Sequence, residues 1–381
     1  MPVVSFAART LPHYRVAFFT DLRNRLAADG VELRVVYGDQ APDETSRRDA
    51  AELEWAEYRP NRFLRVGDRF LIWQPVLDLP RQSDLVIVEQ AARLVANYPL
   101  LLAQLFGQTR VAFWGHGENL QHDSSNRLVE AIKRPISRMP AWWFAYTEGA
   151  RVRVASLGFP DCRITVVNNA SDTSDLRLRL EDLTVEQVEA WRERHELGRG
   201  PIALFLGSIY RDKRIAFALE AAARARRQIT DLQVVIAGGG PDLRLVEHFA
   251  AKNHWVRAIG PVFGHEKALA LTVADLVTVP DAVGLVALDA FTAGRVLVTT
   301  AGRGHGPEFE YLASRKNSLV TGPAMDVDAY ATAIVELLRD KTARRRLEKG
   351  ARAAASEHTL EEMVRRFAAG IRCALSAARS T

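Results

Sequence analysis

The sequence predicts an α/β protein built from two doubly wound parallel sheets. Short apolar runs rich in β-branched residues alternate with longer amphipathic segments along most of the chain. This alternation pauses in a polar stretch at 168–200 and then restarts, and 381 residues are more than one hydrophobic core usually organises. We therefore expect one domain at 1–175, a second at 176–360, and a C-terminal helix at 361–381 that can return to the first domain.

The first half supplies six candidate strands separated by helical patterns. The strands are expected at Val3–Phe6, Val31–Tyr37, Leu85–Val88, Arg110–Trp114, Trp142–Tyr146 and Ile164–Val167. Apolar residues at helical spacing predict helices at Tyr14–Asp29 and Arg93–Phe106. This order is typical of a parallel sheet covered by helices.

The second half repeats the pattern after a helix expected near Thr184–His195. Further strands are expected at Ile202–Leu206, Leu232–Ala237, Val256–Ile259 and Leu276–Val279, with the sheet continuing to Val320. Helices are expected at Arg214–Arg226, Pro241–Lys252, Glu266–Val273, Asp326–Arg339 and from about Leu360 to Ala378. Ligands of open parallel sheets bind beyond the carboxyl ends of strands, so we look for site residues there.

Charge and composition limit the function classes. The formal net charge of +5 and the sequence pI of about 9.3 allow anionic partners such as nucleotide phosphates or lipid head groups. No nucleic-acid-binding motif is present. Cys162 and Cys373 are too few for a disulfide framework or a structural zinc site. No apolar run is long enough to span a membrane and the first residues lack a signal-peptide core, so we expect a cytoplasmic protein.

Two carboxylates flank a turn in the stretch from Val279 to Thr300. Asp281 and Asp289 lie eight positions apart, with Gly284 between them at the expected start of a helix. The first N–H groups of a helix are unpaired and favour an anion such as a phosphate. Carboxylates accept hydrogen bonds from sugar hydroxyls. This combination is what a nucleotide-sugar site needs.

A basic turn follows the strand that ends at Gly207. Arg211 and Lys213 lie in this turn, just before a helix. An arginine grips phosphate through two parallel hydrogen bonds and a lysine adds a compact charge. The alternative is an ordinary solvated helix start.

Three glycines and a proline follow the next strand, at Gly238, Gly239, Gly240 and Pro241. Glycine lets a ligand approach the backbone closely. A tight strand-to-helix turn explains the same residues equally well. The final glycine of a GxGxxG fingerprint is missing and no GxxxxGK[ST] element occurs, which disfavours a dinucleotide oxidoreductase and a P-loop enzyme.

Two histidines lie in glycine-rich loops after strands. His116 lies between Gly115 and Gly117, and His305 precedes Glu308 in the segment Gly302–Leu312. A histidine so placed can bond a sugar hydroxyl or transfer a proton. The alternatives are structural histidines and an acid that caps a helix.

A basic amphipathic pattern occupies Ser125–Phe144. Its apolar residues recur at helical spacing beside Arg127, Lys133, Arg134 and Arg138. Such a segment can dock on an anionic membrane. Packing on the protein's own sheet is the favoured interpretation, because Pro135 interrupts the pattern.

The order of these motifs resembles the family-4 retaining glycosyltransferases of bacteria, which have the GT-B fold. The resemblance rests on the RxK element at Arg211–Lys213, the AGGGP turn ending at Pro241, the ADL segment at Ala274–Leu276, and the segments PDAVGLVALDAF, GPEFEYL and KNSLV. The LPHYR segment at Leu11–Arg15 and the WGHG loop at Trp114–Gly117 add a looser match. The resemblance implies two Rossmann-like domains facing across a cleft, the first binding the acceptor and the second the nucleotide-sugar.

The resemblance also implies roles for the candidate residues. Arg211 and Lys213 would hold the donor diphosphate, Asp289 the ribose hydroxyls, and Asp281 the donor sugar. His116 would lie near the transferred sugar, and the amides around Gly284 and Leu285 would face the diphosphate. Further donor contacts are expected at Gly207, Gly238 and Gly239, and acceptor or sugar contacts at His13, Tyr14, Gly117, His305 and Glu308.

The sequence departs from the family pattern at the acidic pair. Both acids are aspartate rather than glutamate, and the family's EGFG is DAVG here.

The expected activity is hexosyl transfer from a UDP- or GDP-sugar to a hydroxyl of a saccharide or polyprenyl-linked acceptor, with retention and without a divalent metal or other cofactor. Family resemblance places it in cell-surface polysaccharide biosynthesis, at the inner face of the cell membrane. Two alternatives stay open: a nucleotide-sugar epimerase on the same fold, and a non-catalytic binder of phosphorylated ligands.

Overall fold

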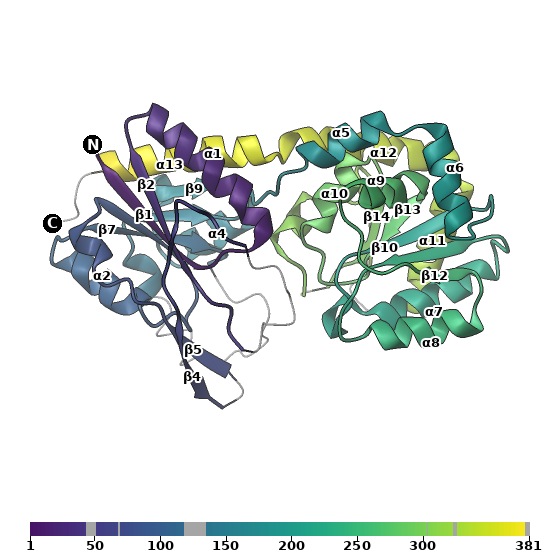
Figure 1. Ribbon diagram of the computed structural model, residues 1–381, viewed down its shortest axis with the longest axis horizontal. Coiled ribbons are helices and arrows are strands. Elements are labelled where there is room, and N and C mark those ends of the chain that lie inside the picture. The colour runs from purple at the N-terminus through teal and green to yellow at the C-terminus, as the bar shows by residue number, and fades with distance from the viewer. Residues whose placement is uncertain (43–50, 68, 118–134, 303, 323–325, 378–381) are drawn as a thin grey trace. The chain divides into compact units, whose positions relative to one another are not determined.

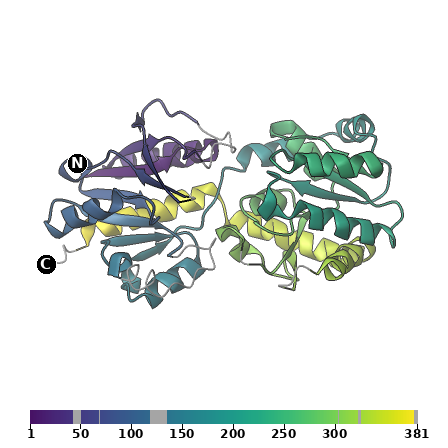
Figure 2. The same ribbon diagram turned by 90° about the horizontal axis from the view of Figure 1, so that it is seen from below.

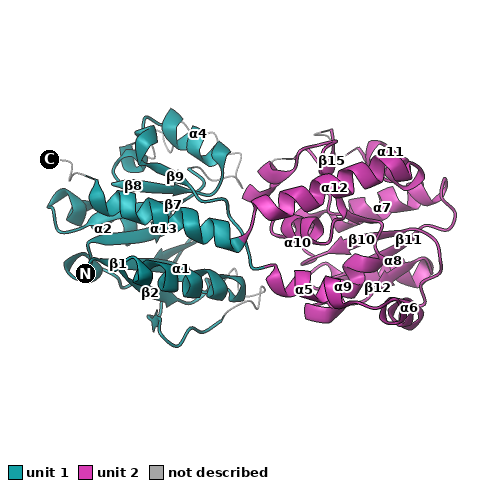
Figure 3. Cartoon of the chain, turned by 90° about the horizontal axis from the view of Figure 1, so that it is seen from above, with its two compact units in different colours: residues 1–172, 360–381 teal, residues 173–359 magenta. Residues whose placement is uncertain are grey.

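The computed structural model describes residues 1–42, 51–67, 69–117, 135–302, 304–322 and 326–377. The chain forms two compact units (Figure 3). Unit 1 contains 1–172 and 360–381, and unit 2 contains 173–359. The division therefore falls at Asp172, close to the expected boundary at 175, and the C-terminal helix belongs to unit 1.

Unit 1 is built on a seven-stranded parallel sheet in the order β3-β2-β1-β6-β7-β8-β9 (Figure 1). The strands are β1 (Val3–Thr10), β2 (Glu32–Gly38), β3 (Glu57–Tyr58), β6 (Leu85–Glu89), β7 (Arg110–Gly115), β8 (Trp142–Ala145) and β9 (Ile164–Val166). All six predicted strands are confirmed. The edge strand β3 was not predicted, because two exposed residues carry no periodic signal.

The helices of unit 1 include the one formed by the end of the chain. They are η1 (His13–Arg15), α1 (Val16–Ala28), η3 (Leu79–Arg81), α2 (Asn97–Leu105), α4 (Glu148–Ser156), η4 (Asp161–Arg163) and α13 (Leu360–Ser376). Phe367 of α13 is fully buried and stacks on Phe144 of β8 with ring centroids 4.3 Å apart. It also meets Phe18 and Trp114 edge-on. Burial of these aromatic rings holds α13 on unit 1.

A two-stranded antiparallel ribbon, β4 (Arg62–Val66) and β5 (Arg69–Trp73), is separate from the seven-stranded sheet (Figure 1). The sequence did not predict it, since exposed arginines interrupt its apolar residues. Ile72 anchors the ribbon to the segment before α2. Its N–H donates to the carbonyl of Arg93 at 2.8 Å, and its carbonyl accepts from the N–H of Val95 at 2.9 Å.

Unit 2 is built on a six-stranded parallel sheet in the order β12-β11-β10-β13-β14-β15. The strands are β10 (Ile202–Leu206), β11 (Gln233–Ala237), β12 (Val256–Ala258), β13 (Leu276–Thr278), β14 (Val296–Thr300) and β15 (Ser318–Thr321). Ile202, Leu204 and Leu206 of β10 enter one hydrophobic cluster, while Ala203 and Phe205 enter the other. Both faces of the sheet are therefore buried, as expected when parallel strands are covered by helices.

Helices cover both sides of each sheet (Figure 2). In unit 2, α7 (Ile215–Arg226), α8 (Leu243–Lys252) and α11 (Val327–Arg339) supply one cluster, while α5 (Ser174–Asp182), α6 (Val185–Arg194), α9 (Gly264–Val273) and α10 (Val286–Thr292) supply the other. The remaining helices are η5 (Arg211–Lys213), η6 (Pro307–Tyr311) and α12 (Lys341–Glu357). The doubly wound α/β prediction is confirmed for both halves of the chain.

The sheets deliver the predicted site residues to strand ends. His116 follows β7, Gly207 follows β10, Gly238 follows β11, and Asp281 follows β13 after two residues. The carboxyl ends of parallel strands lie at one edge of their sheet. Each unit therefore gathers its own candidate residues at one edge.

Gly238 is required by packing between two of these loops. A β-carbon there would lie 1.9 Å from the carbonyl oxygen of Gly207. The N–H of Gly207 donates to Ala237 at 3.0 Å, and the N–H of Ile209 donates to Gly239 at 2.8 Å. The glycine run therefore lets the loops after β10 and β11 lie against each other, which is the tight-turn interpretation of these residues.

Replacing Gly238 with alanine is expected to destabilise unit 2 by roughly 1–3 kcal/mol, because backbone must move to admit the β-carbon. Urea unfolding monitored by circular dichroism measures the loss. Gly322→Ala is the control: among the residues that the structure describes, no atom lies within 4 Å of its added β-carbon, so stability should change by no more than about 0.5 kcal/mol. Equal stability of Gly238→Ala and wild type would contradict this packing argument.

Candidate functional site

The basic turn after β10 buries its lysine and exposes its arginine. Arg211 is exposed, whereas Lys213 is 8% exposed and its Nζ donates to the carbonyl oxygen of Ala282 at 2.5 Å. Burial lowers the pKa of Lys213 to about 8, and the nearby carboxylates of Glu308 and Asp281 oppose that shift. Lys213 is therefore a largely protonated, poorly hydrated cation at neutral pH.

Lys213 is one of several groups that hold the loop from Asp281 to Gly284. The Asp281 carboxylate accepts from the N–H of Ala282 at 2.8 Å. The N–H of Val283 donates to His305 at 3.1 Å, and its carbonyl accepts from the N–H of Gly306 at 2.6 Å. Ala282 takes a left-handed conformation with φ of 50°. These bonds fix the loop in an uncommon backbone shape.

The fixed loop leads into the first turn of α10. Leu285 is the N-cap residue, which agrees with the predicted helix start near Gly284. Within the described residues, no hydrogen-bond partner is found for the N–H groups of Gly284, Leu285 and Val286. Unpaired amides at a fixed loop-to-helix junction can donate hydrogen bonds to the oxygens of an anion.

His305 supports the loop as a neutral ring. Its Nδ1 accepts a hydrogen bond from the N–H of Val283, and its Nε2 lies 2.9 Å from the carbonyl oxygen of Thr300 and 3.3 Å from the backbone nitrogen of Gly302. Its ring stacks on Phe309 with centroids 4.1 Å apart. Burial lowers the pKa of His305, opposed by Asp281, whose Oδ1 lies 3.7 Å from Nε2. Both ring nitrogens are thus engaged within unit 2.

Glu308 lies beneath the same loop. It is 2% exposed, and a β-carbon added at Gly306 would lie 2.8 Å from its Oε2. Its negative charge, like that of Asp281, raises the pKa of Lys213 and so favours the protonated lysine. Lys213, Asp281, His305 and Glu308 therefore lie around one loop.

Asp289 is engaged by a partner that the sequence did not reveal. Its Oδ1 lies 2.9 Å from the Nζ of Lys267 on α9, and both side chains are partly exposed. The charge of Lys267 also reaches Asp175 of α5. The pKa of Asp175 is lowered mainly by its hydrogen bond with Arg179, and Lys267 adds a smaller effect in the same direction. Nothing in the sequence signalled Lys267, because its partner lies 22 positions away on another helix.

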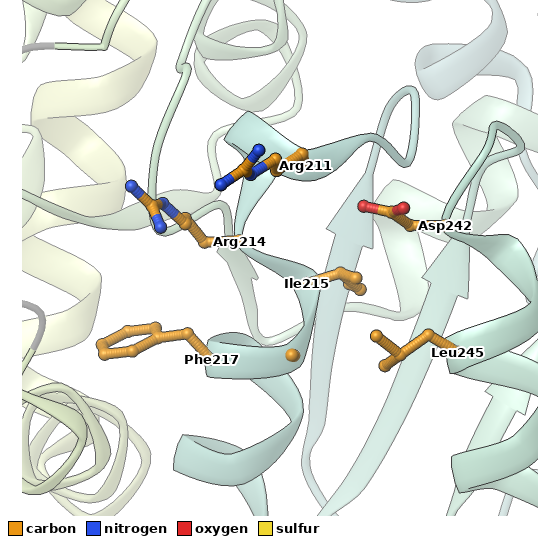
Figure 4. Close-up of a pocket in the computed structure, with 7 residues that line it drawn as sticks. Arg211, Arg214, Ile215, Phe217, Asp242 and Leu245 are labelled. Carbon is orange, nitrogen blue, oxygen red and sulfur yellow. The ribbon is translucent and has the colours of Figure 1, made fainter.

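A pocket of about 380 Å³ lies where α7 and α8 begin (Figure 4). It is lined by Arg211, Arg214, Ile215, Ala216, Phe217, Asp242 and Leu245. Figure 4 shows the two guanidinium groups on one side and Asp242 on the other. The Nε of Arg214 also lies 3.8 Å from the Asp281 carboxylate. Arg211 is thus part of a mixed basic and apolar pocket, whose other residues the motifs did not single out.

The glycines differ in how much room they leave. Gly207 has a φ of 129°, and no atom of the described residues lies within 4 Å of an added β-carbon, so that side of its backbone is open within this part of the chain. Gly239 would place a β-carbon 3.1 Å from Pro261. Open space at Gly207 suits close approach of a ligand, whereas Gly238 and Gly239 face protein atoms.

Unit 1 presents a second group of candidates after β7. The ring of His116 lies against Tyr146 with centroids 4.4 Å apart, and its buried Nδ1 has no hydrogen-bond partner within the described residues. Burial, with a smaller effect of Arg153, lowers the pKa of His116 to about 4. His116 is therefore neutral at pH 7 and offers a free ring nitrogen.

The other unit 1 candidates lie beside buried aromatic residues. The rings of His13 and Tyr14 are 5.8 Å apart. The adjacent Arg15 is buried, lies 4.7 Å from the Trp114 ring and donates to Asn169 at 2.5 Å. Gly117 has a φ of 80°, which favours glycine after His116. Trp114 therefore lies at the end of β7 and His116 just after it, while His13 and Tyr14 lie in η1, which follows β1.

Two further expectations concern metals and membranes. Among the described residues, no group of three or more potential metal ligands is found. No helix in the same part of the chain combines the length and apolarity needed to cross a bilayer. The first half of the predicted basic segment 125–144, residues 125–134, lies outside the described residues, and its last three residues belong to β8.

Sequence comparisons point to glycosyltransferases. Residues 187–354, less than half of the chain, match the family model "Glycosyl transferases group 1". A GDP-mannose-dependent alpha-(1-6)-phosphatidylinositol monomannoside mannosyltransferase from Mycolicibacterium smegmatis is 29% identical over 163 residues, 39% of this chain and 41% of that protein. An alpha-D-kanosaminyltransferase from Streptomyces kanamyceticus is 26% identical over 272 residues, 67% of this chain and 68% of that protein. The first match therefore spans under half of the relative's length.

The solved structures agree on the fold. HepE from Anabaena in complex with UDP matches with a TM-score of 0.72 at 13% identity, over 98% of this chain and 100% of that one. The predicted GT-B fold, with two Rossmann-like α/β units, is confirmed. The family match and the two relatives support a glycosyltransferase.

The protonation state of His116 predicts how stability varies with pH. Its pKa is about 4 in the folded chain and near 6.5 when unfolded. Between these values the unfolded chain binds the proton more strongly, so the free energy of unfolding should rise with pH across this window, by up to about 3 kcal/mol. Urea unfolding monitored by tryptophan fluorescence at several pH values measures the rise.

His116→Gln should remove most of this rise, since glutamine does not titrate. His248→Gln, at an exposed position on α8, is the matched control and should keep it. A pH dependence that survives in His116→Gln would show that another group causes it.

Proposed function

We propose that this protein is a retaining glycosyltransferase of family 4 that moves a hexosyl group from a nucleotide-sugar to a hydroxyl acceptor. In this reaction the bond from the anomeric carbon to the diphosphate breaks as the acceptor oxygen bonds to that carbon. The diphosphate leaves with the electron pair and takes up the proton that the acceptor hydroxyl loses. The observation that carries the proposal is the buried cation Lys213 beside a fixed loop that ends in unpaired amides. That arrangement suits a leaving group that gains negative charge.

Each group at the loop has a role in this proposal. Lys213 and Arg211 hold the diphosphate, and the amides of Gly284 and Leu285 add donors. In this proposal these groups balance the negative charge of the departing diphosphate in place of a divalent metal, so no metal or other cofactor is required. Asp281 holds the loop in the ligand-free chain and contacts the donor sugar once it binds, with His305 and Glu308 supporting the same loop.

Asp289 binds the ribose hydroxyls of the donor. Lys267 occupies its Oδ1, which leaves Oδ2 for a hydroxyl group. Aspartate is shorter than the family's glutamate, and the ion pair fixes its orientation. Lys267 therefore acts as a positioning residue for the ribose.

The donor nucleotide is UDP or GDP. The mannosyltransferase relative is named for GDP-mannose, and the structural neighbour HepE has been solved with UDP and with UDP-glucose. Unit 2 contains most of the matched residues 187–354, which supports it as the donor-binding unit.

The acceptor is a saccharide or a polyprenyl-linked saccharide bound by unit 1. His116, with one free ring nitrogen, bonds the transferred sugar, and His13, Tyr14 and Gly117 border the acceptor. Family resemblance supports a role in cell-surface polysaccharide biosynthesis, in the cytoplasm at the inner face of the cell membrane.

The first test is a thermal-shift screen with UDP, GDP, ADP, dTDP and their common sugar conjugates. One nucleotide should stabilise the wild type selectively. Lys213→Met keeps the side-chain stem without the charge and should weaken its binding roughly 10- to 100-fold, since bonds to a charged group contribute about 1.5–3 kcal/mol. Wild-type affinity should also fall as pH rises through 8, where Lys213 loses its proton. The Lys213→Met profile should be flat there.

Lys252→Met on α8 is the matched control and should bind like the wild type. No shift with any nucleotide, from a sample that unfolds cooperatively, would reject the donor site. Release of free nucleoside diphosphate only when an acceptor is present distinguishes transfer from the epimerase alternative. Binding without turnover over a broad donor and acceptor panel would favour a non-catalytic binder.

A second test separates the ribose contact from general stability. Asp289→Asn and Lys267→Met should each weaken binding of the selected nucleoside diphosphate more than binding of its 2′,3′-dideoxy analogue. Lys267→Arg, which keeps the ion pair, should restore most of the difference. Calorimetric titration gives the dissociation constants. An equal loss for both ligands would assign Asp289 and Lys267 a structural role only.

A further inference from the structure

The residue that opens α7 has a backbone conformation that disfavours its own side chain. Arg214 is the N-cap of this helix, with a φ of 54° and a ψ of 42° in the left-handed region. An arginine there meets a steric cost that a glycine avoids. Its side chain makes no capping hydrogen bond in return. The start of α7 therefore gives no structural reason for an arginine at this position.

The surroundings of the Arg214 side chain separate it from other left-handed residues. Arg315 has a φ of 63° in an exposed turn, so the backbone alone does not mark a site. Arg214, by contrast, lines the pocket of about 380 Å³ together with Arg211. Its Nε lies 3.8 Å from Oδ2 of Asp281, which is too far for a hydrogen bond. The Arg214 guanidinium is therefore held near the loop of the donor site with its N–H donors available to a ligand.

The pocket combines a net positive charge with apolar walls. Two guanidinium groups and the Asp242 carboxylate give its lining one positive charge in excess. In Figure 4 both guanidinium groups lie above Ile215, whereas Phe217 and Leu245 lie below it. Such a pocket suits a ligand that has one negative group, a hydroxyl for Asp242 and an apolar face.

The pocket lies on the opposite side of the sheet from the residues assigned to the ribose. Asp289 and Lys267 belong to α10 and α9, which cover one face of the six-stranded sheet, while α7 and α8 cover the other. Lys213 lies between them, in the turn after the central strand β10. A donor with its ribose at Asp289 and its diphosphate at Lys213 therefore extends its sugar toward the pocket. This step rests on the proposed function.

We propose that the transferred sugar is a hexuronic acid and that Arg214 binds its carboxylate. The planar guanidinium offers two parallel N–H donors, which match the two oxygens of a carboxylate. When the sugar carboxylate takes the place of Asp281 beside Arg214, Asp281 becomes available to the sugar hydroxyls. Asp242 accepts a bond from a further hydroxyl, and the C–H face of the sugar ring lies on Phe217.

Two other roles for Arg214 fit less well. As a third cation for the diphosphate it would duplicate Lys213 and Arg211, and it lies beside Asp281, the residue assigned to the donor sugar. A neutral sugar would engage Asp281 and leave Arg214 without a part in recognition. Its left-handed backbone would then have a cost without a use. A carboxylate on the sugar accounts for both the position and the charge of Arg214.

Calorimetric titration with two matched pairs of donors tests the assignment. UDP-glucuronate and UDP-glucose differ only at C6, as do GDP-mannuronate and GDP-mannose. The wild type should bind the acidic member of one pair roughly 10- to 100-fold more tightly, as expected for a hydrogen-bonded ion pair. Arg214→Gly should abolish this preference and bind the free nucleoside diphosphate like the wild type. Arg214→Lys keeps the charge without the planar fork and should retain part of the preference.

Arg315→Gly is the matched control, because it replaces another exposed arginine with a left-handed backbone. It should leave the donor preference unchanged. Arg214→Gly and Arg315→Gly should both unfold at the same urea concentration as the wild type or a higher one, since glycine takes this backbone shape without steric cost. Loss of the preference in a variant that is no less stable separates recognition from folding.

Equal affinity for the acidic and neutral members of both pairs would overturn this proposal and leave the donor site in place. So would a preference that survives in Arg214→Gly. An equal loss of affinity for the free nucleoside diphosphate in that variant would assign Arg214 to the diphosphate instead. Absence of binding by UDP, GDP and all four conjugates would reject the proposed function, and the hexuronic acid with it.

Discussion

The candidate site depends on one buried cation. Lys213 is removed from water by the turn that carries it, and desolvation of an ammonium group is costly. Its bond to the Ala282 carbonyl and the charges of Glu308 and Asp281 offset that cost. The same contacts hold the Asp281–Gly284 loop in its left-handed shape. An anion reaching Lys213 would meet a donor that has already lost most of its hydration.

The fold could be predicted from local patterns because parallel sheets leave a strong signal. Strands such as β10 are buried on both faces, so they read as continuous apolar runs, and the amphipathic helices between them repeat at a different period. The β4–β5 ribbon has neither property, since its exposed face mixes arginines with leucine and valine. Strand β3 has only two residues, too few to show the alternation of apolar and polar residues that predicts a strand. Prediction failed where elements are short or exposed.

The candidate site could be predicted only in part. Glycines, histidines and acids after strands indicated His116, Lys213, Asp281 and His305, because topology alone brings strand ends together. Lys267 was missed since helix packing, rather than a motif, brings it to Asp289. The histidines also illustrate a limit of sequence patterns. A glycine-flanked histidine looks the same in sequence whether both ring nitrogens have partners, as in His305, or one has no partner among the described residues, as in His116.

The return of α13 to unit 1 has a consequence for biosynthesis. Phe367 closes the aromatic cluster of Phe18, Trp114 and Phe144, yet it is translated only after all of unit 2. Unit 2 is continuous in sequence, so it can fold while the chain is still attached to the ribosome. Unit 1 begins synthesis first and completes its core last. During that interval its aromatic rings lack their final cover, so the nascent N-terminal unit exposes apolar surface until α13 emerges.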